Sequence, residues 1–533
     1  MTGPAPLTPP RPAAPAVEEA IPGREVELKL LVAPADLPRI GLLPEILAMA
    51  DGPAVKQRLH TSYYDTPALE LAARGVALRL RRQNGHRVQS LKTLGADTAG
   101  DAAGIAMRRE WEWEITGDRP DLSLLAEGEL ARVFPADLAD RLDPVFATDM
   151  QRTTLLLRPE PGIAVELALD LGQAVAQPPG KASTHRPISE MELELKSGRL
   201  VDLFRLAAVV HRKVPLRLST RSKADLGFSL LTGESPKASP ARPLGLTPVT
   251  TVAEAFRHMG RNGLAQLLDN EPALMAASDP AALREVAAAL RRIEAAFALF
   301  KGVVASPRGD GLRQEMRELG QPIERARAWD RVAIRVMEPR QRGRQTPRVL
   351  SAAVAGARRA ARMEAVERLN SPRWTAWLLE FGTWLEGGDW DQEGEPGLFA
   401  RTMAEMAPGL LDHRLDKVAK AAAKMAAGED AWRKLWKRTQ RLRYALDYCR
   451  AVWPVEKVRP MLAAVEALRA KLKQAADAHQ ALTLLGGLAE GRDDIGQAVR
   501  PVTADLRRMR DEALREVPAL LAAVQQAAVG LKG

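Results

Sequence analysis

The feature that most constrains the fold is a short segment in which charged and apolar residues alternate, Glu25-Val26-Glu27-Leu28-Lys29. Successive side chains of a β-strand point to opposite faces, so the three charged residues share one face and the apolar residues the other. Carboxylates two residues apart on a strand stand about 7 Å from each other, a spacing that suits metal ions shared with a polyanion. One such segment alone is more typical of an exposed edge strand with salt-bridged charges. Its recurrence along the chain argues against that interpretation.

A hairpin repeats the alternation. Two alternating runs, residues 76–83 and 86–93, flank the dipeptide Asn84-Gly85, which is the strongest short signal for a two-residue hairpin turn. Like charges opposite each other destabilise a strand pair, so a face that collects cations needs an opposite charge nearby. A two-residue turn here predicts three cations on one face of the hairpin: Arg79, Arg81 and Lys92.

Later segments alternate in the same way and carry acids as well as bases. A closed antiparallel barrel with its charged faces turned inward explains the whole set, provided that the lumen holds metal ions and a polyanion. Buried charges must be paired or metal-bound. Carboxylates would hold Mg²⁺ or Mn²⁺, and Arg and Lys would bind phosphate oxygens. The charged faces contain Arg108, Glu110, Glu112 and Glu114; Glu166 and Asp170; Glu190, Glu192, Glu194 and Lys196; and Arg217, Ser219, Arg221 and Lys223.

These motifs resemble those of CYTH domains, the triphosphate tunnel metalloenzymes, which include thiamine triphosphatases, inorganic triphosphatases and class IV adenylyl cyclases. The resemblance covers roughly residues 23 to 231. It rests on these stretches in this order: Glu25-x-Glu27-x-Lys29, Tyr63-Tyr64-Asp65-Thr66, Leu78-Arg79-Leu80-Arg81, Leu91-Lys92, Arg108-x-Glu110-x-Glu112, Asp170-x-Gly172, Glu190-x-Glu192-x-Glu194 and Ser222-Lys223.

The resemblance implies a tunnel in which a metal-activated water attacks a terminal phosphorus. It implies that the catalytic residues are Glu25, Glu27 and Lys29. The implied metal ligands are Glu25, Glu27, Glu110, Glu112, Asp170, Glu190 and Glu192. The implied triphosphate-binding residues are Lys29, Arg58, Arg79, Arg81, Lys92, Arg152 and Lys223.

The C-terminal half has a different composition. Residues 233–250 are rich in proline and small residues and predict a linker, after which an Ala-, Leu- and Arg-rich helical pattern predicts an all-α bundle over 251–533. Through Ser235 the chain has 29 Lys and Arg against 31 Asp and Glu, and the remainder has 48 against 36. The net charge of +10 therefore lies in the helical half, which can attract a polyanion.

The helical half resembles the CHAD domain, a module associated with polyphosphate and often found after CYTH. Residues 282–300 and 433–448 resemble its two signature helices, and the second ends in Arg441-Leu-Arg-Tyr444. Arg284 and Arg433 stand where the family has histidines, and three usual cations are replaced by Ala287, Trp436 and Gln440. Basic residues at helical spacing predict a polyphosphate-binding surface made of Arg284, Arg291, His413, Lys417, Lys420, Lys424, Arg433, Lys437 and Arg441.

The combined prediction is an α+β N-terminal domain with a closed antiparallel β-barrel, followed by an all-α helical-bundle domain. The expected boundaries are a disordered tail at 1–22, the CYTH tunnel at 23–232, the linker at 233–250 and the CHAD domain at 251–533. A single cysteine, Cys449, excludes an internal disulfide framework. No apolar run approaches the length of a membrane helix, so we expect a cytoplasmic protein without a membrane partner that can associate with polyphosphate granules.

The predicted activity is metal-dependent hydrolysis of inorganic triphosphate, with polyphosphate on the helical domain. Three alternatives stay open at this point. The tunnel can act as a class IV-type adenylyl cyclase or another organic triphosphatase, or serve as a non-catalytic polyphosphate scaffold. Nucleic acid is a less favoured partner for the basic half, because few aromatic residues lie on its basic stripes.

Overall fold

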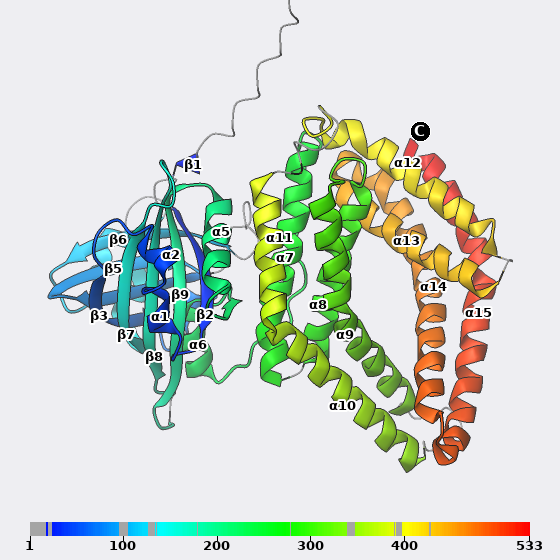
Figure 1. Cartoon of the computed structure of the whole chain (residues 1–533), viewed down its shortest axis with the longest axis horizontal. Helices are drawn as coiled ribbons and strands as arrows, with labels where there is room; N and C mark the ends of the chain where they lie inside the picture. The colour runs from blue at the N-terminus through cyan, green and yellow to red at the C-terminus, as the bar shows by residue number, and fades with distance from the viewer. Residues whose placement is uncertain are drawn as a thin grey trace, which may run out of the picture. The chain divides into compact units, whose positions relative to one another are not determined.

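The structure is a computed structural model. It describes residues 18–19, 24–94, 105–125, 130, 134, 136–178, 180–277, 279–337, 347–388, 390, 397–425 and 428–532. The expected tail at 1–22 lies outside the described residues, apart from Glu18 and Glu19. Apart from Ile105, the described residues before His211 form one compact unit, and those from His211 onward form a second (Figure 1).

Eight strands of the first unit close into an antiparallel barrel. Its strand order is β9-β8-β7-β3-β4-β5-β6-β2, and β2 pairs again with β9 to close the sheet. This confirms the predicted barrel. The strands are β2 (Arg24–Val32), β3 (Val55–Asp65), β4 (Val76–Gln83), β5 (His86–Thr93), β6 (Ile105–Ile115), β7 (Asp143–Leu157), β8 (Ala164–Ala176) and β9 (Thr184–Gly198).

Short elements surround the barrel. The two-residue strand β1 (Glu18–Glu19) pairs with the end of β9, and α1 (Leu37–Ile40) packs against β8 and β9. The other elements are α2 (Pro44–Leu47), α3 (Glu70–Ala73), η1 (Leu122–Leu125), η2 (Ala136–Arg141) and α5 (Leu200–His211).

The hairpin forms as predicted. Asn84 and Gly85 have φ angles of 48° and 86°, the left-handed values that a type I′ turn requires. Gln83 pairs with His86, and the register places Arg79 opposite Ser90. The turn chemistry therefore sets which side chains of β4 and β5 face the lumen.

Alternate residues of each strand face opposite sides of the barrel wall, so charged side chains gather in the lumen and apolar side chains on the outer face. Directly paired residues share a face, and the register joins Arg152 to Asp170 and Asp170 to Glu190 across three strands. On the outer face, Leu78, Leu80 and the other apolar residues of β3 to β6 form a buried cluster with η1, against which Trp111 and Trp113 pack. Burial of this outer cluster stabilises a barrel whose lumen is charged.

Gly172 allows two strands to approach closely beside the charged lumen. A Cβ atom at this position would lie 2.0 Å from the backbone oxygen of Asp149 on β7. Only glycine fits there, which explains the glycine of the Asp170-x-Gly172 motif.

The second unit is helical, as predicted. It begins with β10 (Leu216–Leu218) and α6 (Lys223–Thr232). The longer helices are α7 (Val252–Ala277), α8 (Pro280–Leu299), α9 (Pro307–Met337), α10 (Arg348–Asn370), α11 (Pro372–Gly387), α12 (Met403–Ala422), α13 (Glu429–Cys449), α14 (Val455–Ala489) and α15 (Asp493–Lys532), with the short η5 (Arg450–Val452) before α14.

Two long helices run through prolines, a residue that usually bends or ends a helix. Helix α9 continues through Pro322 and α15 through Pro518. A proline removes one backbone hydrogen bond, whereas Leu319, Ile323 and Ala326 of α9 are all completely buried. Packing around the proline outweighs the lost bond.

An aromatic core holds the start of the helical unit together. Phe256 of α7 meets Trp384 of α11 edge-to-face with ring centroids 5.8 Å apart, and Phe297 of α8 stacks on Trp384 at 5.3 Å. Among the described residues, no helix is both long and apolar enough to cross a membrane.

Candidate active site

Three buried carboxylates converge in the barrel. Asp170 of β8 and Glu190 and Glu192 of β9 place carboxylate oxygens within 4.8 Å of one another. Their residues are 0%, 1% and 8% exposed. Hard oxygen donors at this spacing fit Mg²⁺ or Mn²⁺ by their chemistry.

Two cations share these carboxylates. The Lys29 ammonium donates to Glu190 at 3.2 Å and also contacts Glu192. The Arg152 guanidinium donates to Asp170 at 2.7 and 2.6 Å and to Glu192 at 2.6 Å. Burial by itself would lower the pKa of Arg152, but Asp170 and Glu192 outweigh it and hold that pKa well above its usual value. Two cations against three carboxylates leave one net negative charge in the cluster, which favours a further cation.

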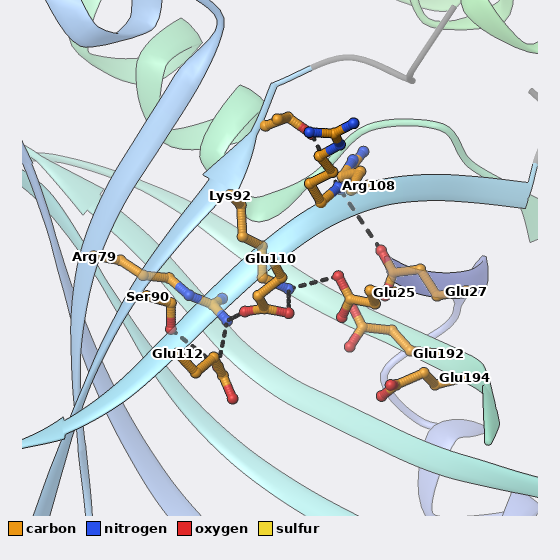
Figure 2. A network of polar contacts seen from close by, with 12 residues as sticks. Glu25, Glu27, Arg79, Ser90, Lys92, Arg108, Glu110, Glu112, Glu192 and Glu194 are labelled. Atoms are coloured by element: carbon orange, nitrogen blue, oxygen red, sulfur yellow. Dashed lines mark hydrogen bonds and ion pairs between the residues drawn. The ribbon is translucent and has the colours of Figure 1, made fainter. Parts of the chain in front are cut away.

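A second network lies beside the first, on β2, β4, β5 and β6 (Figure 2). Lys92 donates to Glu25 at 2.7 Å and lies 2.8 Å from Glu110. Arg79 donates to the same Glu110 at 2.9 Å. Ser90 donates to Glu112 at 3.0 Å. Acids and bases alternate along this wall, so each charge is held in place by its neighbours.

Glu27 lies between the two networks. One oxygen is 3.6 Å from Arg108 and 4.0 Å from Lys29. Burial raises the pKa of Glu27 and the carboxylates of Glu192 and Glu25 raise it further, against the opposing effect of Lys29. Glu27 thus holds a proton more tightly than a free glutamate does, and a bound cation would favour its release.

Arg81 differs from the other lumen cations. Among the described residues, no carboxylate lies within ion-pair distance of its guanidinium, although the charge of Glu112 acts on it from farther away. Its buried Nε has no hydrogen-bond partner, a feature that it shares with the Nε atoms of Arg79 and Arg108. The nearby charge of Arg79, burial and the charge of Arg152 lower the pKa of Arg81 to about 10. A buried cation without a carboxylate partner is expected to attract an anionic ligand.

The structure brings together most of the residues predicted for the tunnel. The first network contains Lys29, Arg152, Asp170, Glu190 and Glu192, and the second contains Glu25, Arg79, Lys92, Glu110 and Glu112. Glu110 and Glu112 make their contacts with Arg79, Lys92 and Ser90, outside the compact carboxylate trio.

The predicted position of Arg58 in the tunnel is wrong. Thr61 of β3 pairs with Arg81 and Gln57 pairs with Arg152, so the odd-numbered residues of this stretch share the lumen face. Arg58 lies on the opposite face and is exposed. Strand alternation places Gln57 in the lumen instead.

Lys223 stays a prediction as a triphosphate ligand. It begins α6 in the second unit, directly after Ser222, which caps the helix by accepting a hydrogen bond from the Asp225 backbone. Arg108, predicted for a charged face but given no role in the site, is 8% exposed and lies beside Glu27. Its shared parity with Glu110 was the available signal.

The helical unit contains a separate cationic cavity of about 510 Å³ between α8, α9, α13 and α14. Four acids and seven cations line it. Each acid is shared, as when Asp477 contacts Arg331 at 3.2 Å and Lys473 at 2.5 Å. The cations are Arg291, Arg292, Arg327, Arg331, Arg443, Arg469 and Lys473.

Two arginines of α9 line this cavity, and each has one acid nearby: Arg327 lies 3.3 Å from Glu324 and Arg331 lies 3.2 Å from Asp477. Burial and the charges of Arg291 and Arg331 lower the pKa of Arg327 to about 10, despite the opposing effect of Glu324. Arg331 has a buried Nη1 without a hydrogen-bond partner among the described residues. Sequence reasoning missed both, although their i, i+4 spacing places them on one helix face.

Of the predicted polyphosphate-binding residues, Arg291 lines this cavity. Lys420 pairs with Asp416 at 2.7 Å, and Arg441 lies 3.6 Å from Glu294. The residues of that prediction that do not line the cavity are Arg284, His413, Lys417, Lys420, Lys424, Arg433, Lys437 and Arg441.

Comparisons with known proteins cover both units. An inorganic triphosphatase from Haemophilus influenzae is 30% identical over 211 residues, which are 39% of this chain and 55% of that protein. The chain thus matches about half the length of this curated relative.

Two solved structures are similar. The CHAD domain from the plant Ricinus communis has 24% identity and a TM-score of 0.47, and the match covers 54% of this chain and 96% of the other. A Hippeastrum protein described as having a dominant triphosphatase activity has 21% identity and a TM-score of 0.27, with 38% and 95% covered.

Two family models match the chain without overlap. The CYTH domain model matches residues 23–226 and the CHAD domain model matches residues 258–486. The protein therefore contains a CYTH domain and, after it, a CHAD domain.

Proposed function

We propose that the protein is a metal-dependent hydrolase of inorganic triphosphate, with the reaction in the barrel lumen. The CYTH domain and the 30% identity to an inorganic triphosphatase support an enzyme that acts on a triphosphate. The observation that carries the proposal is the compact carboxylate trio, whose oxygens lie within 4.8 Å of one another, in a lumen that also contains the cations Arg79, Arg81 and Arg152. A substrate that brings both phosphate oxygens and a divalent ion would complement both features.

The lumen cations can bind a chain of phosphates. Arg81 would donate to a phosphate oxygen at once, because it has no carboxylate to release. Arg79, Lys92 and Arg152 are held in position by carboxylates, so they offer their remaining N–H groups without reorganisation. Such preorganised donors stabilise negative charge that develops during phosphoryl transfer.

Asp170, Glu190 and Glu192 are the proposed metal ligands, with Glu25 and Glu27 close to them. When bound, Mg²⁺ or Mn²⁺ would supply Lewis-acid chemistry and lower the pKa of a coordinated water. Burial of the trio excludes competing water from the carboxylates. Lys29, which contacts Glu190 and Glu192, holds these two carboxylates in place.

A phosphate-release assay tests this proposal. The full-length protein is given inorganic triphosphate, ATP or long-chain polyphosphate, with Mg²⁺, Mn²⁺ or chelator, and ATP reactions are also analysed for cyclic AMP. We expect metal-dependent phosphate release that is fastest with triphosphate, and Glu27→Gln should abolish it while leaving the circular dichroism spectrum unchanged. Cyclic AMP as the main product, or full activity in Glu27→Gln, would overturn the proposal.

We further propose that the cationic cavity of the CHAD domain binds inorganic polyphosphate. Its seven cations exceed its four acids, so it retains positive charge after all internal ion pairs form. Neighbouring cations and burial lower the pKa of Arg327, and Arg331 has a buried Nη1 without a hydrogen-bond partner among the described residues, so an anion would complement both. A flexible phosphate chain can satisfy several such donors at once.

Two charge-reversal variants separate this cavity from the stripe on α12. Arg327→Glu with Arg331→Glu changes the cavity, and Lys417→Glu with Lys420→Glu and Lys424→Glu changes the stripe. We expect the cavity variant to bind long-chain polyphosphate at least about tenfold more weakly, because a charge-assisted hydrogen bond contributes about 1.5–3 kcal/mol. A loss confined to the stripe variant would assign binding to α12 instead.

A further inference from the structure

A second cavity adjoins the cationic cavity and has a different chemistry. It measures about 800 Å³ and lies where α13 ends, η5 follows and α14 begins. Apolar side chains form much of its wall, and they include Trp453, Val455 and Val458. Val455 is 60% exposed, whereas Val458 is buried.

The predicted linker forms one side of this cavity. Residues 241–246 line it, and hydrogen bonds tie this segment to α7. The Asn262 side chain donates to the Arg242 backbone oxygen at 2.9 Å, and Arg242 pairs with Asp269 at 3.0 Å. The wall is therefore formed before any ligand binds, as in most small-molecule sites.

The two cavities meet at a cationic junction. Arg292 and Asp447 line both. The Asp447 carboxylate lies 3.5 Å from Arg292 and 3.6 Å from both Arg443 and Arg450. Three guanidinium groups around one carboxylate leave positive charge at the junction, and the exposed Arg459 adds a cation on the apolar side.

We propose that the joined cavities bind a nucleoside polyphosphate, with the base in the apolar cavity and the phosphates extending past Arg292 into the cationic cavity. Trp453 is half-buried and offers an aromatic surface for the base. Inorganic polyphosphate can pair with the cations of the cationic cavity but has no group that packs against the apolar one. A nucleoside polyphosphate has phosphates for the first cavity and a base for the second. This inference rests on the proposed anion binding by the cationic cavity.

Photolabelling of the full-length protein with 8-azido-ATP tests the inference, because peptide mapping separates this site from the barrel lumen. We expect label on peptides from residues 241–246 and 450–462. Excess ATP and excess tripolyphosphate should both suppress it, since their phosphates compete for the cationic cavity, while adenosine alone should not. Label confined to the barrel, or label that tripolyphosphate does not displace, would overturn the inference.

Variants at Trp453 provide a second measurement. The concentration of 8-azido-ATP that gives half-maximal label on these peptides should rise about tenfold in Trp453→Ala and stay near wild type in Trp453→Phe, which retains an aromatic ring. Met363→Ala on α10 is the control for loss of an exposed apolar side chain. Equal values in all three variants would refute base stacking.

The outcomes also distinguish this inference from the proposed function. Tripolyphosphate affinity of the cationic cavity should be equal in wild type and Trp453→Ala. If tripolyphosphate binds there and 8-azido-ATP does not label the apolar cavity, only the nucleoside inference fails. If neither binds, the anion site itself is refuted.

Discussion

Arg81→Gln should make the barrel more stable and the enzyme less active. The pKa of Arg81 falls from 12.5 to about 10 because of the Arg79 charge and burial. At about 1.36 kcal/mol per unit, this shift corresponds to about 3 kcal/mol. The folded state binds the Arg81 proton less tightly than the unfolded state does, so the charge destabilises the fold at neutral pH. We expect Arg81→Gln to raise the free energy of unfolding by about 1–3 kcal/mol.

Arg79→Gln is the matched control, because Arg79 lies two residues earlier on the same strand and the same face. Arg79 donates to Glu110 at 2.9 Å, and the surrounding carboxylates raise its pKa despite burial. Its removal leaves a buried carboxylate with one cation fewer, which should lower the free energy of unfolding by about 3 kcal/mol. The two neighbouring substitutions should thus change stability in opposite directions.

Both substitutions should lower kcat/KM for triphosphate by about 10- to 100-fold, the equivalent of one charge-assisted hydrogen bond. Stability is measured by urea-dependent hydrogen exchange of peptides from β4 and β5, which reports on the barrel separately from the helices. Activity is measured by phosphate release. If Arg81→Gln destabilises the barrel as Arg79→Gln does, or leaves kcat/KM unchanged, the assignment of Arg81 as an unpaired phosphate ligand is refuted.

Three further predictions follow from buried groups. Asp170→Asn should raise the metal concentration for half-maximal phosphate release by about tenfold or more, since one hard ligand is lost; an unchanged metal titration would exclude Asp170 as a ligand. Burial raises the pKa of Glu271 to about 7, despite a hydrogen bond from Trp374. The folded state therefore binds the Glu271 proton more tightly than the unfolded state does, and the free energy of unfolding of the helical unit should fall by about 3 kcal/mol between pH 4.5 and 8. Urea titrations across this pH range measure the fall. If a Glu271→Gln variant shows the same pH dependence of stability, the raised pKa does not belong to Glu271. Gly172→Ala should reduce soluble, protease-resistant protein, because its Cβ would overlap the Asp149 backbone oxygen; wild-type resistance to limited proteolysis would refute the close approach.

Strand parity made most of the barrel site predictable. Alternation within one strand places Glu25, Glu27 and Lys29 together, and the Asn84-Gly85 turn relates β4 to β5 without further information. The parity of β3 was less clear, because apolar and polar residues occur on both of its faces. Only its register against β4 and β7 shows that Gln57, rather than Arg58, faces the lumen.

The sequence by itself determined the two fold classes, the hairpin register and the sets of acids and bases that enter the barrel, because period-two alternation is a local property of each strand. Tertiary structure decided which charges pair, as the contrast between Arg79 and Arg81 shows: Glu110 accepts a hydrogen bond from Arg79 and raises its pKa, whereas neighbouring cations lower the pKa of Arg81. It also decided that the helical cavity takes Arg327 and Arg331 from α9 and Lys473 from α14. Helix periodicity identifies a basic face, but only packing between helices distant in sequence determines which faces enclose the same space.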